Sequence, residues 1–405
     1  MDLLVVAVFV LVYVGMILGE IPGLALDRSG IALLGAIAIL ASGRATVEQA
    51  WLAIDTPTIA LLFGLMVISA QFRLGGFYTA TVRRIGASAA APERLLLWVV
   101  LAAGALSAVL ANDIVCLAMA PMLVQVCARR RVAPTPFLLG LACAANVGSA
   151  ATLIGNPQNM FIGQSLQLSF AGYLLEGGPP AAFGLIVTWL VIRQQWRGRW
   201  SDAREPRLDR RESTRFDRWQ TTKAWLVLGA TIVSFLFTPW PREVVALAAA
   251  GILLLSRRMA SREMIGLVDW HLLLLFIGLF VVNDAVSRAG LLQQLYAALA
   301  AAGIDLKSDG WLFLVTPVLS NLVSNVPAVM LLLPASGGPQ AGAVLALAST
   351  FAGNLLIVGS IANIIVVEEA GKAGVGIDWR AHVRTGAPVT IATLALAAAW
   401  LWLRS

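Results

Sequence analysis

Polar residues gather at four places in this chain where the surrounding sequence is apolar. Two of these clusters are short: Ala111-Asn112-Asp113 and Ser324-Asn325-Val326-Pro327. The third covers residues 148–159 and reads GSAATLIGNPQN, and the fourth covers residues 353–363. Amide, hydroxyl and carboxyl groups bind ions and small polar solutes, and they are costly at membrane depth unless they have a use. We therefore expect the four clusters to meet in a binding site.

Broken helices would build such a site. A helix that is interrupted at membrane depth leaves backbone N–H and C=O groups whose partners must come from protein, water or a ligand. The N-terminus of a half-helix attracts anions, and unwound carbonyl groups attract cations. The side chains that we expect to line the site are Asn112, Asp113, Ser149, Thr152, Asn156, Asn159, Ser324, Asn325, Ser360 and Asn363.

Asp113 is the sharpest candidate for ion coupling. An intramembrane carboxyl group is functional by default, and burial favours its neutral form, so it could bind and release a proton. We hypothesise that Asp113 is the coupling group for a proton or another cation. A buried ion pair is one alternative. A plain helix N-cap is another, because Asn112, Asn156 and Ser324 also have the residue types of N-caps.

Other residues have simpler interpretations. Asp284 precedes Arg288 by four residues, which predicts an ion pair on a helix surface. Asp55 and Asp269 stand near the starts of apolar spans, where a capping role is expected. Cys116 is interpreted as a small core residue.

Soluble enzyme classes find no support in the sequence. It contains no GxxxxGK[ST], no HExxH and no Ser-His-Asp-like constellation. The three cysteines lack CxxC spacing, and the two histidines, His271 and His382, are far apart, so we expect neither a metal centre nor a cofactor. The net charge of +7 is attributed to basic loops beside a membrane rather than to nucleic-acid binding. Without an ATPase motif, any transport of a solute would depend on a gradient of H⁺ or Na⁺ or on a partner subunit.

The composition indicates that membrane-spanning helices must position the four polar clusters. Hydrophobic residues make up 59% of the 405 residues and charged residues only 13%, about half the charged share of a soluble domain. Several apolar stretches approach the roughly 20 residues that cross a bilayer, and others are shorter, as in broken or re-entrant helices. The sequence therefore predicts an all-α polytopic membrane protein.

The chain reads as two halves with one order of elements. The expected elements of the first half are spans at 3–19, 29–42 and 57–72, an amphipathic segment at 77–90, a hairpin at 94–127, a broken span at 135–172 and a span at 180–195. Those of the second half are spans at 224–238, 243–256 and 270–287, an amphipathic segment at 290–302, a hairpin at 311–336, a broken span at 341–370 and a span at 386–403. We assign an N-terminal repeat to 1–192, a basic linker to 193–223 and a C-terminal repeat to 224–405.

Matching residues support an internal repeat. The matches are Asp55/Asp269, Gly64/Gly278, Leu65/Leu279 and Gly76/Gly290 at an offset of 214, Ser107/Ser320, Asn112/Asn325 and Pro121/Pro334 at 213, and Gly155/Gly359 and Asn159/Asn363 at 204. If each half has five crossings and one re-entrant hairpin, the halves are inverted. With the linker in the cytoplasm, 24 of the 29 Lys and Arg residues then lie inside and both termini lie outside, as the positive-inside rule favours.

These clusters resemble those of the ion transporter superfamily, which includes arsenite pumps, NhaD-type sodium/proton antiporters and divalent anion/sodium symporters. The resemblance covers essentially the whole chain. It implies two re-entrant hairpins, a scaffold domain that often dimerises, and a transport domain that moves as an elevator. Dicarboxylate symporters of this group carry Ser-Asn-Thr at both hairpin tips, where it holds sodium and substrate. Here each Asn is kept, at Asn112 and Asn325, but the first Ser and both Thr are absent.

The Asn112-Asp113 tip looks more like that of the arsenite pumps and related anion permeases, which implies proton coupling. We therefore expect a secondary active transporter of a small anion or arsenite-like oxyacid in the inner membrane, possessing no nucleic-acid partner and dimerising through its scaffold spans. One alternative is a sodium-coupled di- or tricarboxylate symporter with sodium at Asn112 and Asn325. A sodium/proton antiporter and a passive channel are others, although inverted repeats fit alternating access better than a pore.

Overall fold

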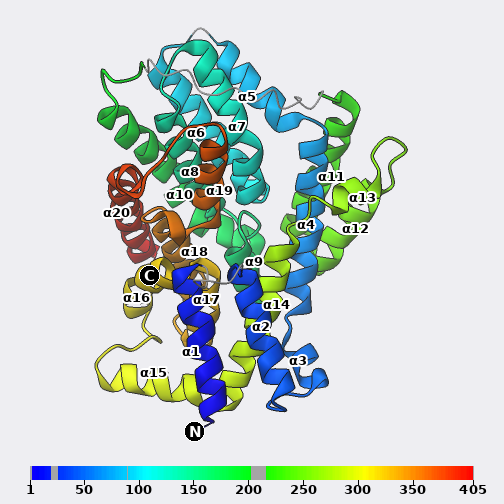
Figure 1. The fold of residues 1–405 in the computed structure, drawn as a ribbon, viewed down its shortest axis with the longest axis vertical. Helices are drawn as coiled ribbons and strands as arrows, with labels where there is room; N and C mark the ends of the chain where they lie inside the picture. The colour runs from blue at the N-terminus through cyan, green and yellow to red at the C-terminus, as the bar shows by residue number, and fades with distance from the viewer. Residues whose placement is uncertain (1, 20–25, 89, 202–215, 405) are drawn as a thin grey trace.

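The computed structural model describes residues 2–19, 26–88, 90–201 and 216–404. These residues form twenty α-helices and two short 3-10 helices, and they contain no β-strand (Figure 1). The helices of the first half are α1 (Leu3–Leu18), α2 (Arg28–Ala41), α3 (Val47–Ala53), α4 (Thr56–Leu74), α5 (Phe77–Ala87), α6 (Pro92–Val109), α7 (Asn112–Arg130), α8 (Thr135–Ser149), α9 (Pro157–Ser165) and α10 (Phe170–Gln195).

The second half follows the same order. Its helices are α11 (Arg218–Phe237), α12 (Arg242–Leu254), α13 (Ser261–Ile265), α14 (Trp270–Arg288), α15 (Leu291–Ala301), α16 (Asp309–Val323), α17 (Asn325–Leu332), η1 (Leu333–Ala335), α18 (Ala341–Ala352), η2 (Ile357–Gly359), α19 (Ile361–Lys372) and α20 (Trp379–Arg404). The expected linker at 193–223 begins inside α10 and ends inside α11, and its residues 202–215 lie outside the described residues.

Capping side chains and left-handed glycines set helix boundaries at equivalent positions of the two halves. Asp55 and Asp269 cap α4 and α14, and each side chain accepts a backbone hydrogen bond at 3.0 Å, from Thr58 and Leu272 respectively. The cap interpretation of these two residues is thus confirmed. Gly76 and its match Gly290 precede α5 and α15 with φ of 69° and 72°, a left-handed conformation that favours glycine.

Several sequence expectations need correction. The span expected at 386–403 begins seven residues earlier, at Trp379, and continues through Pro388. The span expected at 180–195 begins ten residues earlier, at Phe170, because the Ser169 hydroxyl caps α10 by accepting from Gly172 N at 3.2 Å. The helix then continues through Pro179 and Pro180. The short helices α3 and α13, which precede α4 and α14, were not expected at all.

Close backbone contacts hold the helices together at matched positions. A Cβ at Gly64 on α4 would lie 2.6 Å from the carbonyl carbon of Ala246 on α12. A Cβ at Gly278 on α14 would lie 2.6 Å from that of Ala32 on α2. Both glycine and alanine are 214 residues from their counterparts. Helices α4 and α12 therefore pack as closely as α14 and α2 do.

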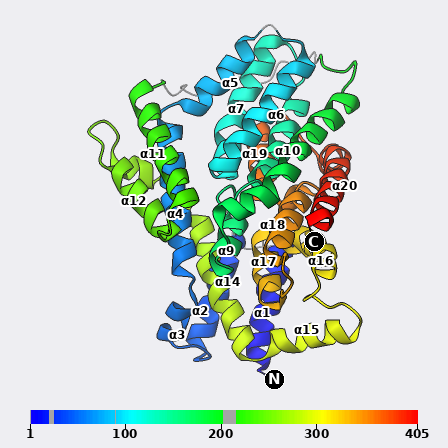
Figure 2. The same ribbon diagram turned by 180° about the vertical axis from the view of Figure 1, so that it is seen from behind.

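The helices fall into two groups that meet at the centre. Helices α4, α11 and α12 stand to one side of α6, α7, α8 and α10 in both views (Figures 1 and 2). The amphipathic helices α5 and α15 lie at opposite ends of the molecule. Helices α8, α9, α18 and α19 come together between them, where the polar clusters lie.

Seven helices of the described residues are long and apolar enough to cross a membrane: α4, α6, α7, α10, α11, α14 and α20. Seven further apolar segments are shorter. The expected all-α polytopic membrane fold is thus confirmed. The seven include both arms of the first hairpin, α6 and α7, so helix length alone does not distinguish a re-entrant hairpin from two crossings.

Candidate functional site

Two interrupted helices form the centre of the molecule. In the first half α8 stops at Ser149 and α9 resumes at Pro157, and in the second α18 stops at Ala352 and α19 resumes at Ile361. Asn156 caps α9, since its Oδ1 accepts from the backbone N–H of Asn159 at 2.9 Å. The cap interpretation is therefore correct for Asn156.

Asn146, near the end of α8, joins the two halves. Its Nδ2 donates to the side-chain oxygens of Asn354 at 2.9 Å and Asn363 at 3.1 Å. Its Oδ1 accepts from the hydroxyl of Ser360 at 2.8 Å and from Nδ2 of Asn112 at 3.4 Å. One buried amide thereby links the first hairpin tip to the second broken helix.

Thr350 on α18 makes the matching connection in the opposite direction. It lies 204 residues after Asn146, and its Oγ1 accepts from Nδ2 of Asn156 and from Nε2 of Gln158, each at 3.2 Å. It also donates to Oδ1 of Asn159 at 3.5 Å. Each half therefore sends one polar side chain into the break of the other half.

Asn159 and Asn363 satisfy the backbone that the breaks leave free. Nδ2 of Asn159 donates to the carbonyl oxygen of Thr152 at 3.0 Å. Nδ2 of Asn363 donates to the carbonyl oxygens of Gly353 at 2.7 Å and Leu356 at 3.1 Å. Because an unpaired carbonyl group is costly in an apolar interior, the two amides stabilise the interrupted helices.

A second pair supports the same loops from α10 and α20. The Tyr173 hydroxyl donates to the carbonyl oxygen of Ala150 at 2.8 Å and accepts from Nδ2 of Asn159 at 3.2 Å. Nε2 of the buried His382 lies 3.1 Å from the carbonyl oxygen of Asn354. Ala150 and Asn354 are again 204 residues apart, so a tyrosine and a histidine have equivalent places.

The hairpin tips rest against the same breaks. The backbone N–H of Asn112 donates to the carbonyl oxygen of Gly155 at 3.2 Å. Turned so that both of its ends are satisfied, the Asn325 amide donates to the carbonyl oxygen of Gly359 at 2.9 Å and accepts from Nε2 of Gln158 at 3.2 Å. No side chain makes a capping hydrogen bond at the start of α7 or α17. The cap alternative is therefore wrong for Asn112 and Asp113, whereas Ser324 stands at the N-cap position of α17 without a side-chain bond.

All ten expected site residues are buried. Ser149 donates to the Asn146 carbonyl at 2.8 Å and accepts from Nδ2 of Asn156 at 2.9 Å. The Thr152 hydroxyl instead holds the Ala108 carbonyl of the first hairpin at 2.5 Å. Ser324 forms the second tip with φ of 75°, a strained value for a residue with a side chain. Eight of the ten thus belong to one hydrogen-bonded network: Asn112, Ser149, Thr152, Asn156, Asn159, Asn325, Ser360 and Asn363.

Two buried polar atoms at this network have no partner among the described residues. They are Oδ1 of Asn112 and Nδ2 of Asn354, both on side chains that bind Asn146. Buried polar atoms are nearly always paired, so each exception needs an explanation. One free acceptor and one free donor beside the same amide are the groups that a small hydroxylated solute would satisfy.

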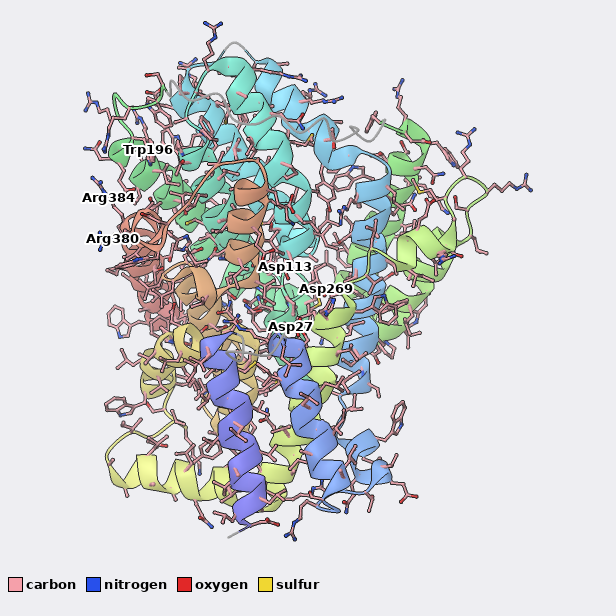
Figure 3. All side chains as sticks on the ribbon, in the orientation of Figure 1. Asp27, Asp113, Trp196, Asp269, Arg380 and Arg384 are labelled. Atoms are coloured by element: carbon pink, nitrogen blue, oxygen red, sulfur yellow. The ribbon has the colours of Figure 1, made fainter. Side chains whose placement is uncertain are left out.

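Asp113 faces a cavity rather than the network. It is 9% exposed, and its carboxylate makes no hydrogen bond or ion pair with any residue that the structure describes. The cavity measures about 330 Å³ and lies between the first hairpin and α9 on one side and α4 and the start of α14 on the other. Asp113 and Asp269 both line it and lie near one another in Figure 3.

The matching region of the other half is filled by aromatic rings. Leu62, Met66 and Ile365 line the cavity, and their counterparts at offsets of 214, 214 and 204 are Phe276, Phe280 and Phe161. The ring of Phe161 packs on those of Phe280 and Phe276, with centroids 5.4 and 6.5 Å away. The counterpart of Asp113 is Val326. The cavity and the aromatic cluster therefore make the two sides of the site different.

Sequence reasoning missed Asn146, Tyr173, Thr350 and His382, which lie outside the four clusters. Gln158 and Asn354 lie inside the clusters but were not among the ten expected site residues. Asn146 and Thr350 differ in residue type, so the one sequence signal that relates them is the offset of 204 that they share with Gly155/Gly359 and Asn159/Asn363. The predicted ion pair of Asp284 with Arg288 is confirmed at 2.6 Å.

A helical membrane protein with a buried polar centre between two interrupted helices belongs to the class of membrane transporters. Residues 9–352 match the family model described as "Citrate transporter". The chain belongs to this citrate transporter family, which confirms the expected superfamily.

Relatives agree with this placement. An uncharacterized transporter of Mycobacterium bovis is 30% identical over 100% of this chain and 99% of its own. The inner membrane protein YbiR of Escherichia coli is 31% identical, with 82% and 84% covered, and the silicon efflux transporter LSI3 of Oryza sativa is 25% identical, with 93% of each chain covered. The crystal structure of the YdaH transporter of Alcanivorax borkumensis shares the fold, with a TM-score of 0.59, 15% identity and 99% and 98% coverage.

Proposed function

We propose that this membrane transporter is a secondary active transporter of a small oxyacid or its anion, arsenite-like in size and chemistry and coupled to protons. The observation that carries the proposal is the Asn146 network, in which free acceptor and donor atoms of Asn112 and Asn354 flank one buried amide. The four polar clusters contain no Lys or Arg. Neutral donors and acceptors suit a hydroxylated solute that carries little charge.

The rice transporter LSI3 supports an oxyacid as the substrate class. LSI3 is named for silicon efflux, and the hydroxylated acids of silicon and of trivalent arsenic both present several O–H groups to a site. The proposed coupling group is Asp113, because its carboxylate is buried, unpaired among the described residues and directed into a cavity. A proton taken up there would neutralise a charge that burial disfavours.

Membership of the citrate transporter family favours a second candidate, a sodium-coupled symporter of citrate or a related carboxylate. Such a protein would hold sodium at the tips around Asn112 and Asn325, and helix N-termini would serve its anionic substrate. A sodium/proton antiporter that uses Asp113 alone is a third candidate. The ion dependence of transport separates all three.

We further propose that the two halves are inverted repeats and that hairpins and broken helices move together as an elevator. The matched contacts of Gly64 and Gly278, and the positions of α5 and α15 at opposite ends, support this arrangement. The linker would face the cytoplasm and both termini the outside, as the Lys and Arg distribution favours. A homodimer would form through the scaffold helices α1–α5 and α11–α15.

The test is uptake by proteoliposomes with an imposed pH gradient or an imposed sodium gradient. The solutes are arsenite, silicic acid, sulfate, succinate and citrate. We expect a pH gradient alone to drive accumulation of an oxyacid, and Asp113→Asn to abolish it while the purified protein keeps its elution volume and melting temperature. Asp284→Asn is the matched control, because Asp284 pairs with Arg288 away from the cavity.

Undiminished pH-driven uptake by Asp113→Asn would refute the coupling role. Accumulation that requires sodium would instead favour the carboxylate symporter. Exchange of sodium for protons without any solute would favour the antiporter.

A further inference from the structure

Asp113 does not face its cavity alone. Asp269, at the start of α14, lines the same cavity, and the two residues lie near one another in Figure 3. One oxygen of Asp269 accepts from the backbone N–H of Leu272 at 3.0 Å, which holds the carboxylate in place as an N-cap. The fixed charge of α14 thus stands opposite the unpaired charge of the first hairpin.

The two residues come from different halves of the chain. Asp113 lies on the hairpin of α6 and α7, beside the broken helices, and Asp269 lies on α14, which packs on α2 through Gly278. The other charged or titratable groups that face the cavity are Arg73 from α4 and His271 from α14, whereas α9 and α19 contribute only apolar side chains. His271 also lies 3.7 Å from Asp27 at the exposed rim (Figure 3).

We propose that Asp113 and Asp269 form a proton site across the cavity between the first hairpin and the start of α14. Asp113 takes up a proton while it faces Asp269 and releases the proton when the hairpin moves away. The physical reason is that two nearby carboxylates cannot both ionise freely, so the proximity of Asp269 favours a neutral Asp113. This inference rests on the proposed proton-coupled transport and names the second group of its coupling site.

Asp55 makes a sharp control possible. It is the counterpart of Asp269 at an offset of 214, and it caps α4 with the same 3.0 Å hydrogen bond, to Thr58 N. It faces the Ser165 hydroxyl at 3.4 Å instead of Asp113. Asp→Asn at either position keeps an N-cap residue and removes one charge, but only Asp269→Asn removes the charge that faces Asp113.

The experiment is a pH titration of the purified protein in lipid nanodiscs, followed by the infrared carbonyl band of protonated carboxylic acids. We expect a band in the wild type that Asp113→Asn removes. In Asp269→Asn the pH at which this band is half-formed should fall by about one unit or more, as expected for the loss of a neighbouring like charge. In Asp55→Asn it should stay at the wild-type value. Asp269→Ser repeats the test with another capping residue in case Asp269→Asn is unstable.

An Asp269→Asn band that is half-formed at the wild-type pH would overturn the inference, and so would the absence of any band that depends on Asp113. Loss of the band on addition of sodium would identify sodium as the ion and would also overturn it. The proposed function is judged separately by uptake. If pH-driven uptake is present and the Asp269→Asn band is unshifted, only this inference fails. If the band shifts and no pH-driven uptake occurs, only the proposed function fails.

Discussion

Replacing Asn146 by alanine should loosen the centre of the molecule more than any other single change to its polar network. The substitution removes four hydrogen bonds, to Asn354, Asn363, Ser360 and Asn112. At about 0.5–1.5 kcal/mol for each bond, the expected loss of stability is about 2–6 kcal/mol. The partners left behind are buried, and this places the cost toward the upper part of that range.

The assay combines the melting temperature in detergent with uptake by proteoliposomes. We expect Asn146→Ala to melt several degrees lower and to transport poorly, because the first hairpin and the second broken helix lose their connection. Asn146→Thr, which introduces the residue type of Thr350, should be milder. Asn283→Ala is the control, since Asn283 accepts one bond from Tyr13 at 2.9 Å outside the network.

A wild-type melting temperature together with wild-type uptake in Asn146→Ala would refute this reasoning. It would mean that the helix interruptions are held by backbone contacts and packing, and that the amide at position 146 is dispensable.

Other substitutions test the packing and the supports of the breaks. Gly278→Ala and Gly64→Ala should each lower the free energy of unfolding by about 1–3 kcal/mol through overpacking, because the new methyl group would meet backbone 2.6 Å away. Gly229→Ala on α11 is the control, since nothing lies within 4 Å there, and its melting temperature should be unchanged or raised. Equal losses at all three positions would contradict the contact argument. Tyr173→Phe should lower the melting temperature, because it removes the donor to the Ala150 carbonyl. His382→Tyr introduces the hydroxyl that Tyr173 has at the equivalent place of the first half, so it should lower the melting temperature less than His382→Ala does. The reverse order in thermal melts would argue against the equivalence of Tyr173 and His382.

Much of the fold could be predicted because its signals are local. Long apolar stretches predicted the helices, and capping residues such as Asp55 and Asp269 marked their starts. The start of α10 was missed because a proline pair at 179 and 180 usually ends a helix, while here the Ser169 cap begins the helix earlier and α10 continues through both prolines. The short α3 and α13 were missed because helices of seven and five residues carry little periodicity.

The candidate site was predictable only where residue type and position in the chain coincide. Asn156 stands before a proline and caps a helix, so its place was visible in the sequence. Asn146 lies inside a helix and has no such signature. Its partners Asn354 and Asn363 are 208 and 217 residues away, and only the packing of the two halves brings them together.

The aromatic cluster of Phe161, Phe276 and Phe280 should make the free energy of opening the site different on its two sides. Opening a path there would separate Phe161 from two ring partners, at about 0.5–1.5 kcal/mol for each contact. The total of about 1–3 kcal/mol corresponds to a population ratio of roughly 5 to 150. On the side of Leu62, Met66 and Ile365 a cavity takes the place of these three rings, and the aromatic contact beside it is that of Trp270 with Phe63, with centroids 6.1 Å apart. Under the proposed elevator movement, we expect the unloaded protein to favour the state in which its Asp113 side is open, and a solute that shifts this balance must supply the difference through its own binding.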